Sequence, residues 1–131
     1  MFLDASAIVA MIIGEPDAEV LAVKLKGAMR PMYCALGHFE AVLAVSRVKG
    51  MPAATAVDLI GILIEKCGAQ CIPITEEIGK VAISASTEFG KGRHRARLNM
   101  GDCFSYACAK VLGVPLLCKG DDFRHTDIQI A

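Results

Sequence analysis

The chain begins Met1-Phe2-Leu3-Asp4-Ala5-Ser6-Ala7, a short apolar run followed at once by an acid. The apolar run is typical of a buried strand, and Asp4 or Ser6 suits the N-cap of a helix that Gly14 ends. The first acid therefore stands at the carboxyl end of the first predicted strand. Ligands of parallel α/β sheets bind in the crevice outside this end of the strands.

Outward from this stretch, short apolar runs continue to alternate with helical patterns. Strands are expected over Cys71–Ile74, Val114–Cys118 and Asp127–Ile130, and helices over Ala7–Ile13, Ala18–Met29, Ala35–Val48, Ala53–Lys66, Glu76–Phe89 and Asp102–Leu112. A basic loop precedes the last helix, and a turn follows the Val114–Cys118 strand. We find no repeat or linker. The sequence therefore predicts a single domain over residues 1–131, an α/β sandwich with a mainly parallel central sheet.

Composition narrows the classes of protein. The 131 residues are 54% hydrophobic, which excludes intrinsic disorder, and 14 basic residues balance 14 acidic ones. No overall field therefore attracts nucleic acid or membranes. No apolar run approaches the roughly 18 residues of a membrane span, and the N-terminus lacks a basic signal-peptide region. The six cysteines lie in apolar surroundings without a Cys-x-x-Cys pair. We expect a reduced, cytoplasmic protein with no membrane partner.

Five acids stand in apolar surroundings or directly after a predicted strand, namely Asp4, Glu40, Asp102, Asp121 and Asp122. A parallel sheet brings strand ends together, so these acids can share one crevice. Crowded carboxylates raise one another's pKa unless a cation neutralises them. Oxygen-rich side chains without matching bases suit Mg²⁺ or Mn²⁺, which can lower the pKa of a bound water and stabilise charge on a phosphodiester.

Each acid also has a purely structural explanation. Asp4 and Asp102 suit helix N-caps, worth about 1 kcal/mol each. Glu40 can pair with Arg47 on roughly the same helix face, and Asp121-Asp122 suits a turn. Ser6 can hydrogen-bond an acid or a metal-bound water, or serve as a cap.

An ordered set of segments resembles the PIN-domain ribonucleases, in particular the VapC toxins of bacterial type II toxin–antitoxin pairs. The set comprises Met1–Ala7, the helical Glu40, Leu98–Phe104, Leu116–Phe123 and Thr126–Ile128, and it covers nearly the whole chain. The resemblance implies a small three-layer α/β/α nuclease with an acidic pocket for Mg²⁺ or Mn²⁺. It also implies a homodimer and a VapB-type antitoxin that blocks the pocket, often through an inserted basic residue.

The resemblance assigns the acids one by one. The family's first three acids fall on Asp4, Glu40 and Asp102, its fourth on Asp122 with Asp121 as the substitute, and its hydroxyl on Ser6. It implies hydrolysis of an RNA phosphodiester by in-line attack of water. By the same resemblance, Asp4 and Asp102 would chiefly hold the metal, and Glu40 would complete the ligand set or orient a metal-bound water. Asp122 would lie outside the ligands or support a second ion.

A basic loop precedes the third acid and carries Lys91, Arg93, Arg95 and Arg97. These cations can track an RNA backbone, giving an affinity that falls with salt. A solvated surface loop, or a contact for an acidic antitoxin tail, explains them as well. Aromatic residues make up 5% of the chain, with no Trp, so no platform for base stacking is predicted.

Two other functions remain open. A haloacid-dehalogenase-like phosphatase or phosphotransfer domain also places a nucleophilic Asp after its first strand, but needs a second Asp where this chain has Ser6. A non-catalytic module that binds RNA or protein through the basic loop leaves the acids in apolar surroundings unexplained.

Overall fold

A computed structural model describes all residues 1–131 of the protein. Short strands alternate with helices along the chain, and none of the helices is both long and apolar enough to cross a membrane. The elements are β1 (Phe2–Leu3), α1 (Ala5–Ile13), α2 (Ala18–Lys26), β2 (Met32–Cys34), α3 (Ala35–Lys49), α4 (Ala53–Cys67), β3 (Gln70–Ile72), α5 (Glu76–Phe89), α6 (Met100–Leu112), β4 (Leu116–Leu117) and the 3₁₀ helix Asp122–His125.

The four strands form one parallel sheet in the order β3-β2-β1-β4. Phe2 of β1 lies opposite Met32 of β2 on one side and Leu116 of β4 on the other. β1 is therefore an inner strand, and its carboxyl end lies between those of β2 and β4. Asp4 follows directly at that end, with its backbone N–H donating to the carbonyl of Leu117 (2.9 Å).

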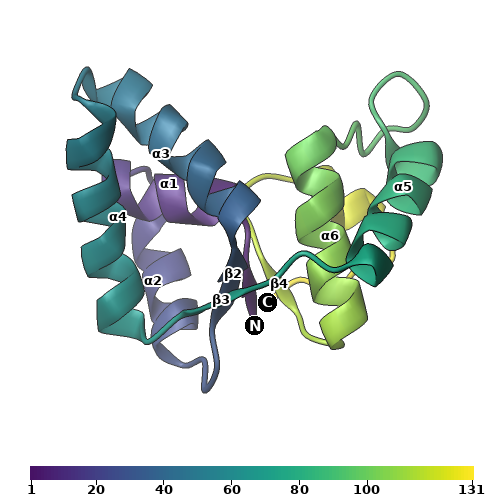
Figure 1. The fold of residues 1–131 in the computed structure, drawn as a ribbon, viewed down its shortest axis with the longest axis horizontal. Coiled ribbons are helices and arrows are strands. Elements are labelled where there is room, and N and C mark those ends of the chain that lie inside the picture. The colour runs from purple at the N-terminus through teal and green to yellow at the C-terminus, as the bar shows by residue number, and fades with distance from the viewer.

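Helices cover both faces of the sheet, α1 to α4 on one side and α5 with α6 on the other (Figure 1). Adjacent strand residues point to opposite faces. Phe2 and Leu116 accordingly belong to the core beneath α5 and α6, whereas Leu3 and Leu117 belong to the core beneath α1 to α4. The predicted α/β fold with three α/β/α layers is confirmed.

Several predicted boundaries were wrong. α2 ends at Lys26 rather than Met29, and the predicted turn after β4 runs into the 3₁₀ helix. The expected last strand is a single bridge between Ile130 and Leu116. β2 was not predicted at all, because three residues between Pro31 and a helix show no period. It is a strand because β1 and β3 pair with it, which is a tertiary effect.

Candidate active site

Asp4 is 3% exposed and lies where β1 passes into α1. Its Oδ2 accepts hydrogen bonds from the Ser6 backbone N–H (2.9 Å) and from the Ser6 hydroxyl, so Asp4 is the N-cap of α1. The Ser6 hydroxyl oxygen in turn accepts from the Lys119 backbone N–H (3.0 Å) just after β4. Oδ1 of Asp4 accepts no hydrogen bond from the protein. The structural role as a cap therefore uses one carboxylate oxygen and leaves the other free.

Glu40 lies on α3 and is half-buried against the first turn of α6. Its carboxylate occupies the space that a side chain on Gly101 would take. A Cβ built on Gly101 would stand 2.1 Å from each Glu40 carboxylate oxygen. Gly101 therefore permits the contact between the two helices. The alternative pairing of Glu40 with Arg47 is wrong, since no ion pair joins them.

Asp102 is the third residue of α6, not its N-cap as the sequence suggested; the N-cap is Asn99. The two form a reciprocal capping box. The Asn99 N–H donates to Asp102 Oδ2 (2.8 Å), and the Asp102 N–H donates to Asn99 Oδ1 (3.1 Å). This box orients the Asp102 side chain and again leaves one carboxylate oxygen without a hydrogen bond.

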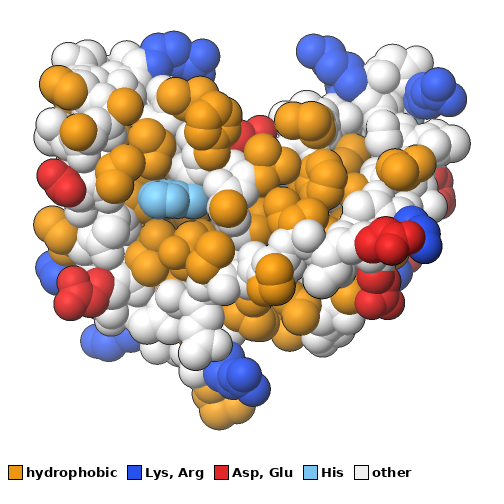
Figure 2. All heavy atoms as spheres, in the orientation of Figure 1, with side chains coloured by type: hydrophobic (Ala, Val, Ile, Leu, Met, Phe, Trp, Pro, Cys, Tyr) orange, Lys and Arg blue, Asp and Glu red, His pale blue; other side chains and the backbone are white.

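One pocket of about 410 Å³ brings Asp4, Glu40 and Asp102 together from three separate elements. Ser6 and Asn99 also line it, as do Ala5, Val9, Glu15, Ala44, Arg47 and Lys119. In the space-filling view, acidic side chains are visible at the base of the notch between the two helical layers (Figure 2). The pocket stands outside the carboxyl end of the parallel sheet, as expected for an α/β fold.

Crowding changes the titration of these acids. Burial, and then the charges of Asp4 and Asp102, raise the pKa of the Glu40 carboxyl to about 7. Burial also raises the pKa of Asp102 to about 6; the hydrogen bond from Asn99 opposes this rise, and the charges of Asp4 and Asp122 add to it. Without a cation, Glu40 therefore changes its charge near neutral pH, and Asp102 changes its charge about one pH unit lower.

The remaining two acids separate in the structure. Asp122 lines a smaller cavity of about 250 Å³ with Asp102, Asn99, Lys91 and Arg97. Asp121 lines neither cavity, and its carboxylate pairs with Arg124 (3.3 Å). Of the two, only Asp122 faces the acidic site.

None of the four cations of the basic loop has a carboxylate partner. Lys91 and Arg97 reach the small cavity beside Asp102, and Arg97 has a left-handed backbone with φ 51°. Such a conformation costs energy in a non-glycine residue and is often found at functional sites. Arg93 lines a different cavity, between α5 and α6, and Arg95 lines an open surface hollow of the loop itself.

Sequence reasoning missed three residues of the site, namely Asn99, Gly101 and Lys119. The Asn-x-x-Asp spacing that ends at Asp102 is a capping-box pattern and could have identified Asn99. Lys119 lines the acidic pocket, where its ammonium group pairs with Glu15. No pattern in the sequence marks Gly101, because only the packing of α3 on α6 gives it a role.

The donor chemistry of the pocket fits a divalent cation. No group of three or more acidic, histidine or cysteine side chains forms a preassembled metal cage. Mg²⁺ does not need such a cage, since it keeps several waters and binds through one or two carboxylates. Asp4 and Asp102 each offer a carboxylate oxygen that the protein does not use. The acids whose pKa is raised are also those that a cation would stabilise.

A model of the PIN domain matches residues 1–129. The chain belongs to the PIN-domain family. Among its relatives, "Ribonuclease VapC30" of Mycobacterium tuberculosis is 38% identical over 98% of this chain and 95% of its own length. "Ribonuclease VapC" of Mycolicibacterium smegmatis is 40% identical over 98% of this chain and 97% of its own length. The relationship therefore extends over the whole PIN domain and is not limited to a motif.

The fold of this PIN domain also resembles a solved structure. Mycobacterium tuberculosis VapC20, described as a sarcin–ricin loop cleaving toxin, superposes with a TM-score of 0.78 at 16% identity. The match covers 99% of this chain and 97% of VapC20. At that identity the similarity concerns the fold alone, and it agrees with the three layers described above.

Proposed function

We propose that this protein is a VapC-type endoribonuclease, the toxin of a toxin–antitoxin pair, which hydrolyses RNA phosphodiester bonds with Mg²⁺ or Mn²⁺. The observation that carries the proposal is the convergence of Asp4, Glu40 and Asp102 in one pocket of a PIN domain. Relatives at 38–40% identity over nearly the full chain are named VapC ribonucleases, which supports the substrate class.

In this proposal Asp4 and Asp102 hold the ion, and Glu40 completes the ligand set or orients a bound water. The ion, when bound, lowers the pKa of a water and neutralises charge on the phosphodiester. The other residues hold these acids in place. Ser6 fixes one oxygen of Asp4, and Asn99 fixes one oxygen of Asp102. Asp122 supports the site from outside the ligand set.

Lys91 and Arg97 complete the proposed site on the substrate side. Both line the small cavity beside Asp102, and neither is paired with a carboxylate of the protein. They can bind RNA phosphates and so hold the scissile bond against the acids for in-line attack by water. Arg93 and Arg95 extend this positive charge along the same loop.

The phosphatase alternative lacks support in the structure. The position that would need its second Asp is Ser6, whose hydroxyl donates to Asp4 and accepts from the Lys119 N–H. A non-catalytic binding module gives no reason for three carboxylates to share one pocket.

The proposal includes a VapB-type antitoxin, a homodimer and a cytoplasmic location. The names of the relatives support the antitoxin. The space-filling view adds a surface feature, a broad gathering of hydrophobic side chains over α3 and the neighbouring helices (Figure 2). Exposed apolar residues of α3 and α4 include Phe39, Leu43, Val48, Val57 and Ile62. Contiguous apolar surface of this kind marks protein interfaces.

Cleavage of a circular RNA by the purified protein tests the proposal, because a circle has no ends and reports only internal cuts. We expect linear products with Mg²⁺ or Mn²⁺, none with EDTA, and recovery when the metal is added back in excess. Cutting that persists in EDTA would contradict metal dependence. A protein that cuts neither circular nor linear RNA with either metal would contradict the nuclease itself.

The raised pKa values predict how stability depends on pH in metal-free protein. Glu40 and Asp102 have folded pKa values of about 7 and about 6, against roughly 4 in an unfolded chain. Between these values the folded state binds more protons, so their contribution to the free energy of unfolding falls as pH rises from about 4 to about 7. We expect Asp102→Asn to flatten this dependence in urea unfolding.

Added Mn²⁺ should reverse the trend. It raises the unfolding free energy more at about pH 7.5 than at about pH 5, since at lower pH it must displace protons from the carboxyls.

The metal-free measurement has its own contradicting outcome. If the unfolding free energy of wild type and of Asp102→Asn changes equally with pH, the crowding of these acids is wrong.

A further inference from the structure

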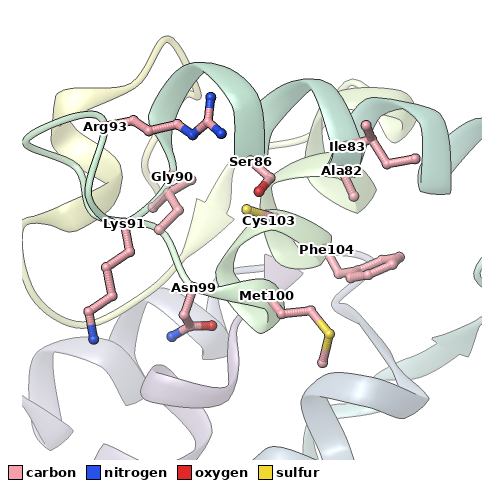
Figure 3. Close-up of a pocket in the computed structure, with 11 residues that line it drawn as sticks. Ala82, Ile83, Ser86, Gly90, Lys91, Arg93, Asn99, Met100, Cys103 and Phe104 are labelled. Atoms are coloured by element: carbon pink, nitrogen blue, oxygen red, sulfur yellow. The ribbon is translucent and has the colours of Figure 1, made fainter.

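A second cavity, of about 440 Å³, lies between α5 and α6 beside the basic loop (Figure 3). Its wall is largely apolar and includes Ile83 of α5 with Met100 and Phe104 of α6. Met100 and Phe104 are four residues apart and share one helix face. Figure 3 shows Ser86 of α5 and Cys103 of α6 side by side where the two helices meet, with Arg93 extending from the loop.

This cavity adjoins the acidic site. Asn99 lines the cavity, the acidic pocket and the small cavity that holds Asp122. Lys91 likewise lines both the cavity and the small cavity next to Asp102. A nucleotide chain whose phosphate lies at the acids therefore has this cavity within reach of its next residue.

Polar groups at the edge of the cavity lack partners within the protein. Asn99 uses its Oδ1 in the capping box, while its amide Nδ2 donates to no protein group. Lys91 and Arg93 form no ion pair. The cavity thus combines an apolar wall, a free amide donor and two unpaired cations. Its size falls in the range of small-ligand sites, roughly 300–1,000 Å³.

We propose that this cavity binds the base of a nucleotide adjacent to the scissile phosphodiester. The inference rests on the proposed ribonuclease function and adds a base subsite to it. The base packs against Phe104 and the apolar wall, and its polar edge meets the Asn99 amide. Lys91 and Arg93 bind the phosphates on either side. The low aromatic content of the sequence predicted no platform for base stacking. A single ring, that of Phe104, is nevertheless enough to stack one base.

The charge of the rim favours RNA over a second protein chain as the occupant. Lys91 and Arg93 belong to a loop with two further unpaired cations, Arg95 and Arg97, and a polyanion neutralises such a run along its length. A base also has the two properties that the cavity requires, an apolar face and a hydrogen-bonding edge. If a second protein chain occupied the cavity instead, filling the cavity would change the mass of the particle in solution.

The test compares RNAs of one sequence that each carry a single abasic nucleotide near the cleavage site. With wild-type protein, we expect the abasic change at one flanking position to lower kcat/KM about tenfold or more, the loss expected from one base–aromatic contact. Ser86→Trp fills the cavity from an exposed helix position. This variant should cut the intact RNA about as slowly as wild type cuts the abasic one, and should no longer distinguish the two.

Two further variants sharpen the comparison. Ser84→Trp places the same large side chain on an exposed position of α5 outside the cavity, and should keep the wild-type preference. Phe104→Leu keeps an apolar side chain and removes the ring, so it should lose part of the preference while remaining folded.

The outcomes separate the two proposals. If wild type cuts RNA but no flanking base matters, or Ser86→Trp keeps the preference, the base subsite is wrong while the nuclease stands. If Ser86→Trp keeps the preference but changes the mass measured by light scattering, the cavity belongs to an interface between chains, and the subsite is again wrong. If wild type cuts no RNA, the proposed function fails and the subsite fails with it.

Discussion

Replacing Asp102 with asparagine is expected to lower the rate of RNA cleavage by about 10³-fold or more, because a metal ion supplies several kcal/mol of transition-state stabilisation. The variant keeps the size of the side chain. Its amide oxygen can still accept the hydrogen bond from the Asn99 N–H that closes the capping box. It also removes a negative charge that raises the pKa of Glu40. The free energy of unfolding should therefore be unchanged or higher.

The measurements are cleavage rates at saturating Mn²⁺ and urea unfolding of the same preparations. Asp58→Asn is the matched control, since Asp58 is an exposed acid of α4 that lines none of the described pockets. Asp4→Asn should behave like Asp102→Asn, because an amide oxygen can still cap α1. If both site variants cleaved RNA at the wild-type rate, these two carboxylates would have no part in the reaction. If Asp102→Asn failed to fold, the negative charge of Asp102 would be needed for stability, contrary to the crowding of the acids.

The fold could be predicted where local patterns determine it. β1 and the start of α1 follow from an apolar run, a capping acid and a glycine, and Gly14 indeed ends α1 with a left-handed φ of 76°. Elements that depend on tertiary pairing could not be predicted. β2 has three residues, and Ile130 contributes only one bridge, so neither leaves a period in the sequence.

The candidate site shows the same division. Asp4 could be placed from sequence because the strand end fixes its position. The structure brings it together with Glu40 and Asp102, but the spacing along the chain could not give the contacts between them. The packing of α3 on α6 sets the position of the Glu40 carboxylate, and the capping box sets the direction of the Asp102 side chain. Asp121 and Asp122 are neighbours in sequence, and only the fold separates their surroundings.

Gly101→Ala is expected to lower cleavage about 100-fold while leaving the protein folded. The new methyl group would stand 2.1 Å from both oxygens of Glu40, so the Glu40 carboxylate has to move. A displacement of about 1 Å at a catalytic group can cost about 10²-fold in rate. Alanine also lowers the conformational entropy of the unfolded chain relative to glycine, which opposes the cost of moving a flexible side chain. The cleavage rate should therefore fall strongly, while the free energy of unfolding should change little.

Two comparisons decide whether Gly101 acts through Glu40. Gly61→Ala is the matched control, because Gly61 lies inside α4 with no atom within 4 Å of a built Cβ. It should stabilise the protein slightly and leave cleavage unchanged. In a Glu40→Ala background the carboxylate is absent, so Gly101→Ala should lower the rate little further, a non-additivity typical of contacting residues. If the two losses instead multiply, Gly101 acts on the site by another route, and the close contact of α3 with α6 does not position Glu40.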